Sequence, residues 1–201
     1  MSFVGRNLYS AEDTIWDDPS RLPEAALHLL GKFSQVQSLC DHLVSRYLVV
    51  KAPGIEWLVQ KRVLTTMRDE DRMRAVREIA VELSSADHLA NAPQAFNQLK
   101  DARDHLGHSA TTSVLLDAQG WFLHVNVPAD DKRAQRVGRL NAPAFGQLFV
   151  TCDWLFDQLY WTGEQAGLFT VHLLNGEQAI TEQPPLTPPR WQPGHRLRYG
   201  I

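Results

Sequence analysis

The sequence has little of what marks several classes of protein. Its 201 residues include two cysteines, Cys40 and Cys152, whose wide separation predicts neither a disulfide framework nor a zinc site. No group of His, Asp or Glu has the spacing of metal ligands, so we expect no metal and no cofactor. No apolar run approaches the ~20 residues that span a bilayer. We therefore expect no membrane contact and a reducing, cytoplasmic location.

The sequence also has no excess of basic charge. Twenty Lys and Arg stand against 23 Asp and Glu, which gives a formal net charge of −3. Any contact with nucleic acid must therefore come from a local basic patch. An apolar share of 44% and six Trp are enough for a core and argue against a disordered chain. The length fits one domain with appendages.

Four stretches have the apolar spacing of amphipathic helices. They cover about residues 23–50, 55–84 with a bend near Asp69, 92 to about 108, and 142–162. Arginines 68, 72, 74 and 77 alternate with acids in the second stretch, which is typical of a solvated, salt-bridged face. The fourth stretch is apolar on most of its circumference, so we expect it to be buried or to face a partner chain.

Short β-type runs lie between and after these helices. Residues 112–116 and 121–127 predict a hairpin with Gly120 at the turn, and residues 168–180 predict a second one around Asn175-Gly176. Residues 128–141, with four basic side chains, are predicted to be a polar loop. The expected fold is mainly α: a four-helix bundle with an inserted β-hairpin and a second C-terminal hairpin.

The domain organisation follows from these elements. We expect residues 1–183 to form a single helical domain with its hairpin insertions. Residues 184–201, rich in Pro and Arg, are expected to be an extended tail, because proline excludes both helix and central strand. This tail is predicted to be dispensable for the fold.

The segment with the most reactive side chains is Arg103 to His108, Arg-Asp-His-Leu-Gly-His, late in the third predicted helix. Random placement of 15 Arg and 8 His over 201 residues gives about 0.6 Arg-x-x-x-x-His pairs, so the pair alone is a weak signal. A second pair, Arg190 and His195, spans a Pro and a Gly, and we interpret it as chance. Requiring Asn, Asp or His after the arginine, as Asp104 provides, lowers the expectation to about 0.08.

This element resembles the signature of the HEPN superfamily: Arg, a small polar residue, three further residues and His, late in the third of four helices. Leu30 to Ser34 resembles the opening of such domains less specifically. The resemblance covers about residues 22–162. It implies a homodimer in which both motifs line one cleft and cut RNA without metal through the ribose 2′-hydroxyl. Carried over, Arg103 and His108 are the catalytic pair, and Asp104 orients them.

The chemistry of these side chains is compatible with that implication. Asp104 and His108 are four apart on a helix, so we expect them to meet and the carboxylate to favour imidazolium. Histidine exchanges protons near neutral pH, and a guanidinium can hold a phosphate with two hydrogen bonds. Each residue also has a structural alternative. Arg103 could pair with a buried carboxylate, His108 could cap the helix end, and His105 could share or replace the role of His108.

Two functions from different classes therefore remain open. The first is a metal-independent endoribonuclease acting on single-stranded RNA as a homodimer, a toxin or defence effector with an antitoxin protein as partner. The alternative is a non-catalytic HEPN-like interaction or nucleotide-sensing module. An open cleft with Arg103 and His108 converging would favour the enzyme, whereas a buried Arg103 in an ion pair would favour the module.

Overall fold

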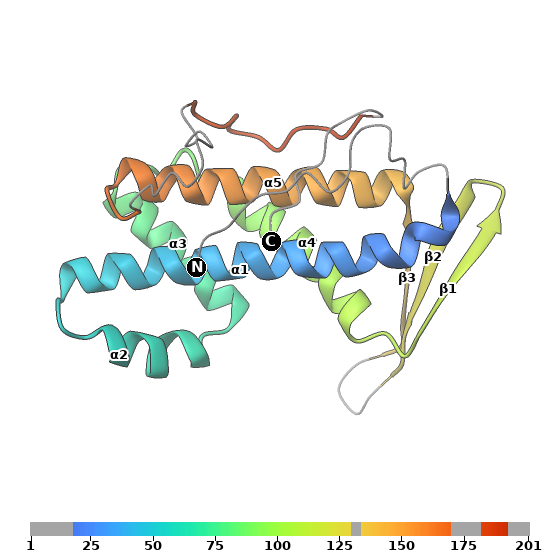
Figure 1. Cartoon of the computed structure of the whole chain (residues 1–201), viewed down its shortest axis with the longest axis horizontal. Coiled ribbons are helices and arrows are strands. Elements are labelled where there is room, and N and C mark those ends of the chain that lie inside the picture. Colours follow the sequence, from blue (N-terminus) through green and yellow to red (C-terminus); the bar gives the residue numbers. More distant parts are fainter. Residues whose placement is uncertain (1–17, 130–133, 170–181, 193–201) are drawn as a thin grey trace, which may run out of the picture.

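The computed structural model describes residues 18–129, 134–169 and 182–192 (Figure 1). Within them the protein is mainly helical with one small antiparallel sheet, which confirms the expected class. The helices are α1 (Leu22–Lys51), α2 (Glu56–Leu58), α3 (Asp69–Glu82), α4 (Ala92–Gly107) and α5 (Ala142–Gln165). The strands are β1 (Thr111–Asp117), β2 (Gly120–Val127) and β3 (Arg136–Asn141). The predicted second hairpin lies almost wholly outside the described residues.

Helices α1 and α5 are the two long elements and lie side by side (Figure 1). Helix α1 has Pro23 in its first turn and ends at Lys51, before a turn in which Gly54 takes a positive φ of 91°. Helix α5 begins after Asn141, whose side chain accepts a hydrogen bond from the Ala144 amide at 3.0 Å. The two ends of each helix agree to within a few residues with the predicted ranges, 23–50 and 142–162.

The predicted second helix is wrong as one element. Residues 55–66 form the short α2 and two further irregular helical turns, and the backbone becomes extended at Met67 and Arg68. Helix α3 then starts afresh at Asp69. Three acids in its first turn favour a new helix start there, because they complement the positive end of the helix dipole. The expected bend near Asp69 is therefore a break.

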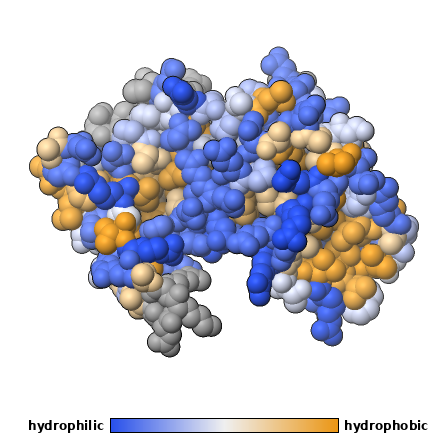
Figure 2. All heavy atoms as spheres, turned by 180° about the vertical axis from the view of Figure 1, so that it is seen from behind, coloured by the Kyte–Doolittle hydropathy of each residue, from blue (hydrophilic) through white to orange (hydrophobic). Residues whose placement is uncertain are grey.

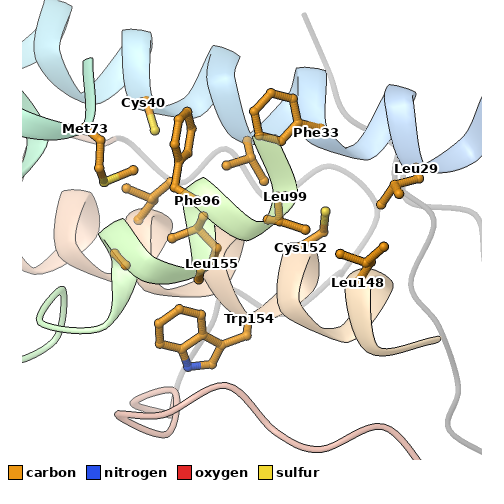
Figure 3. Close-up of a cluster of buried hydrophobic side chains, with 14 of the residues drawn as sticks. Leu29, Phe33, Cys40, Met73, Phe96, Leu99, Leu148, Cys152, Trp154 and Leu155 are labelled. Atoms are coloured by element: carbon orange, nitrogen blue, oxygen red, sulfur yellow. The ribbon is translucent and has the colours of Figure 1, made fainter. Parts of the chain in front are cut away.

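The core lies where α1, α3, α4 and α5 meet (Figure 3). Figure 3 shows side chains from all four helices pointing into one cluster: Leu29, Phe33, Cys40, Met73, Phe96, Leu99, Leu148, Cys152 and Leu155. Both cysteines are fully buried, and burial raises the pKa of the Cys152 thiol to about 12. Neither thiol is therefore a reactive group at neutral pH.

The sheet lies at one end of the helices and has three strands in the order β1-β2-β3. The predicted hairpin is confirmed as β1 and β2, with Gly120 at a φ of 106° in the turn. Strand β3 corrects the predicted polar loop, because part of that loop pairs antiparallel with β2. The register places Leu140 opposite Leu123, which gives β3 an apolar contact with β2. The basic residues around Leu140 made this segment look like a polar loop in the sequence.

The described part of the proline-rich tail, residues 184–192, packs along α5 (Figure 1). Trp154 Nε1 donates to the Pro185 carbonyl at 2.6 Å, and Gln147 bonds the segment further along. The Trp191 ring lies so close to Gly146 that a Cβ there would stand 2.4 Å from it. The segment is extended but is not a free tail, and it covers apolar surface of α5, the helix predicted to be buried or to face a partner chain.

Candidate functional site

Helix α4 positions the Arg-x-x-x-x-His element. Phe96, Leu99 and Leu106 bury one face of α4 in the core, so Arg103, near that face, reaches toward α1 and α3. The helix ends at Gly107, and His108 follows as its C-terminal capping residue. The backbone amide of His108 donates to the Asp104 carbonyl at 3.2 Å, which closes the last turn. Arg103 therefore lies within the helix, beside the core, whereas His108 lies beyond the last helical residue.

Arg103 is held by two carboxylates and an aromatic ring. Its Nη2 lies 2.5 Å from Asp69 Oδ2, and its Nη1 lies 3.0 Å from Asp104 Oδ1. Its guanidinium carbon lies 5.2 Å from the centre of the Phe33 ring. The side chain is 28% exposed. The structural alternative for Arg103, pairing with a largely buried carboxylate, is thus the observed arrangement.

Asp69 links this pair to a wider ionic network. Its Oδ1 accepts hydrogen bonds from Gln37 Nε2 at 2.7 Å and from Arg72 Nη1 at 2.6 Å. Arg72 also bonds Asp41 of α1 through Nε at 2.5 Å. Burial opposes the charged form of Arg72, but its hydrogen bond to Asp41 and the two carboxylates outweigh this and raise its pKa. The network joins α1, α3 and α4 across the edge of the core.

Asp104 does not meet His108 as expected. Its Oδ2 lies 3.0 Å from Lys100 Nζ, and its Oδ1 bonds Arg103. Side chains on a helix lean toward its N-terminus, which carries Asp104 toward Lys100. His108 has already left helical geometry, with φ −105° and ψ 6°. The sequence spacing assumed a helix that continues through His108.

The two histidines also differ from each other. His105 Nδ1 lies 2.7 Å from the Asp101 carbonyl, and its ring packs close to Gly138 of β3, where a Cβ would stand 3.4 Å from the ring. His105 therefore joins α4 to the sheet. His108 is exposed, and its side chain makes no hydrogen bond or ion pair within the described ranges. The structure describes no contact between Arg103 and His108.

A shallow polar cleft lies where α1 meets residues 60–65, and Asp41 of the ionic network is one of its lining residues. It has a volume of about 340 Å³ and is lined by Ser38, Asp41, His42, Gln60, Leu64 and Thr65. Sequence reasoning missed it, because its residues come from two elements whose packing no periodicity reveals. Within the described part of the chain, no three His, Cys, Asp or Glu side chains gather as metal ligands.

Comparison with known proteins adds no family. No protein-family model, no curated protein and no solved structure matches this chain. None of the helices in residues 18–129, 134–169 and 182–192 is long and apolar enough to cross a membrane.

Proposed function

We propose that this chain is a HEPN-like helical module that acts by binding a macromolecular partner and does not cleave RNA. In this proposal α1, α3, α4 and α5 are the four helices of the bundle, and the sheet is an insertion between the last two. The observation that carries it is the position of Arg103, whose two terminal nitrogens both bond carboxylates.

This arrangement is poorly suited to phosphate chemistry. A phosphate approaching Arg103 would have to displace Asp69 or Asp104, and both carboxylates would repel it. The same contacts suit a structural role, because Arg103 joins α4 to α3 and covers the Phe33 ring of α1. Removing it would leave Asp69 with one cationic partner fewer.

Exposed apolar side chains support a binding role. Figure 2 shows apolar surface at both ends of the molecule, separated by a hydrophilic band. Trp57, at 63% exposure, and Val50, at 61%, lie toward one end, and Trp121, at 47%, lies on the sheet at the other. Exposed aromatic groups of this size are typical of interaction surfaces.

The test is an RNA cleavage assay run beside a stability measurement. We expect folded wild-type protein to leave single-stranded RNA intact, with chelator or without it. We expect Arg103→Ala to lower the free energy of unfolding by about 1–2 kcal/mol, since it removes two partly exposed charge-assisted bonds. Cleavage that Arg103→Ala abolishes while the fold is retained would contradict the proposal.

A second candidate is the metal-independent endoribonuclease, and one observation favours it. His108 is exposed at the end of α4, three residues before Thr111, which pairs with Asn126. Arg136 pairs with the next residue, Val127, so an arginine stands at the same end of the sheet as His108. Single-stranded RNA, a homodimer and an antitoxin are the partners this candidate requires.

The endoribonuclease makes its own pattern of expected results. Cutting would persist in chelator and leave a 2′,3′-cyclic phosphate. His108→Ala would lose at least ~100-fold in rate, since acid–base catalysis contributes about 10²–10⁴-fold. Arg103→Ala would lose a similar amount, because a transition-state donor contributes about 10²–10³-fold. Asp104→Asn would be milder, and His105→Ala would stay near wild type if it still folds.

A further inference from the structure

Strand β1 is an open edge of the sheet. It pairs with β2 from Thr111 through Asp117, and its other edge has no partner strand among the residues the structure describes. Such an edge presents a row of backbone N–H and C=O groups that another strand can bond. Because these groups lie at the end of the molecule, a second chain can reach them (Figure 1).

Strand β1 itself also has few of the residues by which proteins protect open strands. Between Thr111 and Leu116 there is no charged residue and no proline. Only Val114 is partly covered, while Leu115 is 43% and Leu116 is 61% exposed. Figure 2 shows apolar surface over this end of the molecule. An uncharged edge of this length, with Leu115 and Leu116 exposed, is suited to strand addition.

We propose that β1 pairs antiparallel with β1 of a second copy of the chain, about a twofold axis at Val114. This forms one continuous six-stranded sheet. The inference rests on the proposed binding function and names its partner.

The charge pattern favours a second copy as the occupant. Antiparallel pairing about Val114 places Ser113 opposite Leu115 of the second copy, and Thr112 opposite Leu116, so no like charges face each other. Asp117, the one charged residue of β1, falls opposite Thr111 and is already paired with Arg139. Two chains with a net charge of −3 can thus approach along a neutral strand, with the same patch used on both sides.

The test uses the full-length chain and two matched double variants. Wild-type protein should sediment as a dimer at micromolar concentration. Ser113→Lys with Leu115→Lys places lysines opposite each other twice across the axis and should raise the dimer dissociation constant at least about tenfold. Ser113→Lys with Leu115→Glu places opposite charges there instead and should restore dissociation to within about threefold of wild type. Both variants change the same two exposed positions.

The controls separate this interface from other surfaces. Leu27→Lys and Val81→Lys change side chains that are 70% and 65% exposed on α1 and α3, and should leave the dimer unchanged. A monomeric wild type, a Lys/Lys variant that still dimerises, or a Lys/Glu variant that stays monomeric overturns the proposal. Amide exchange protection of β1 in a monomer would mean that another segment of the chain covers this edge. The binding function itself fails separately, if the RNA assay shows cutting.

Discussion

The helical body and the sheet end of the molecule differ in the partners that they give to the two ends of the Arg-x-x-x-x-His element. In the helical body, Arg103 bonds two carboxylates, and the extended segment along α5 accepts a hydrogen bond from Trp154. At the sheet end, His108 is exposed without a side-chain partner in the described ranges, and β1 has an open edge there. Helix α4 runs from one region into the other.

This difference shows why a short motif need not act as a unit. Five residues on a helix turn through about 140°, so Arg103 can lie beside the core while the position of His108 faces elsewhere. The helix also ends between them, which frees the second residue from the helix surface altogether. Spacing alone therefore places two side chains on one element without placing them in one site.

The largest effect should come from removing the extended segment that covers the helical body. Ending the chain after Gln183 exposes Trp154 and leaves the amide of Gln158, which is fully buried, without its carbonyl partners. We expect a loss of about 3 kcal/mol or more, at roughly 1 kcal/mol per hydrogen bond plus apolar exposure. This corresponds to a fall in Tm of about 6–12 °C, measured by calorimetry.

Two point substitutions sharpen that experiment. Trp191→Ala removes the ring against Gly146 and should give part of the loss, whereas Arg190→Ala changes an exposed side chain and should give none. A truncated protein that melts within about 2 °C of wild type would show that the segment contributes little, as the sequence alone predicted.

Breaking the ionic network should have the next largest effect. Asp69→Ala leaves Arg72 and Arg103 without a shared carboxylate, and we expect a loss of about 2–3 kcal/mol, below the 3–5 kcal/mol of fully buried pairs because Arg103 is partly exposed. Asp69→Asn should cost less, since the amide oxygen still accepts hydrogen bonds. The measurement is urea unfolding. Equal losses for both variants would mean that charge, and not hydrogen bonding, decides the effect.

A smaller effect on the free energy of unfolding should appear when the pH is lowered, because His42, next to Asp41 of the network, then becomes protonated. Burial and then the charge of Arg46 lower the pKa of this imidazole, whose ring stacks on Phe169 with centres 5.0 Å apart. The folded state thus binds its proton less readily than the unfolded state, so stability is retained above pH ~6.5 and falls as pH drops toward the lowered pKa. His42→Gln should remove this dependence of the free energy of unfolding on pH, which urea unfolding at several pH values measures. If the variant keeps the same pH dependence, a group other than His42 is responsible for it.

The sequence predicted those parts of the fold that local patterns determine. The helical class, α1, α4, α5 and the first hairpin follow from apolar periodicity and from glycine and proline positions. Strand β3 could not be predicted this way, because its six residues become a strand only through pairing with β2. The packing of residues 184–192 on α5 could not be predicted either, because a Pro-rich sequence is typical of an extended tail. The contact depends on Gly146, which leaves room for the Trp191 ring.

For the candidate site, the sequence predicted which helix carries the motif but not how its side chains are arranged. The spacing correctly placed Arg103 and Asp104 on one helix. It could not show that Asp69, 34 positions away, bonds Arg103, because that contact depends on how α3 packs against α4. The alternation of charges predicts a solvated face for Arg72, yet this residue is 9% exposed and bonds two carboxylates. The pairs Arg72–Asp41 and Arg103–Asp69 join different helices, and such long-range contacts leave no periodic signal in the sequence.

The smallest effect on stability should come from the exposed end of the motif. His108 has no side-chain partner in the described part of the protein, so His108→Ala should change the free energy of unfolding by less than about 0.5 kcal/mol. Its matched variant, Arg103→Ala, lies on the same helix and should cost more, because it breaks two ion pairs. Urea unfolding of both proteins under one condition measures the difference. If His108→Ala proves as costly as Arg103→Ala, His108 has a partner in solution, and the contrast between the two ends of α4 is lost.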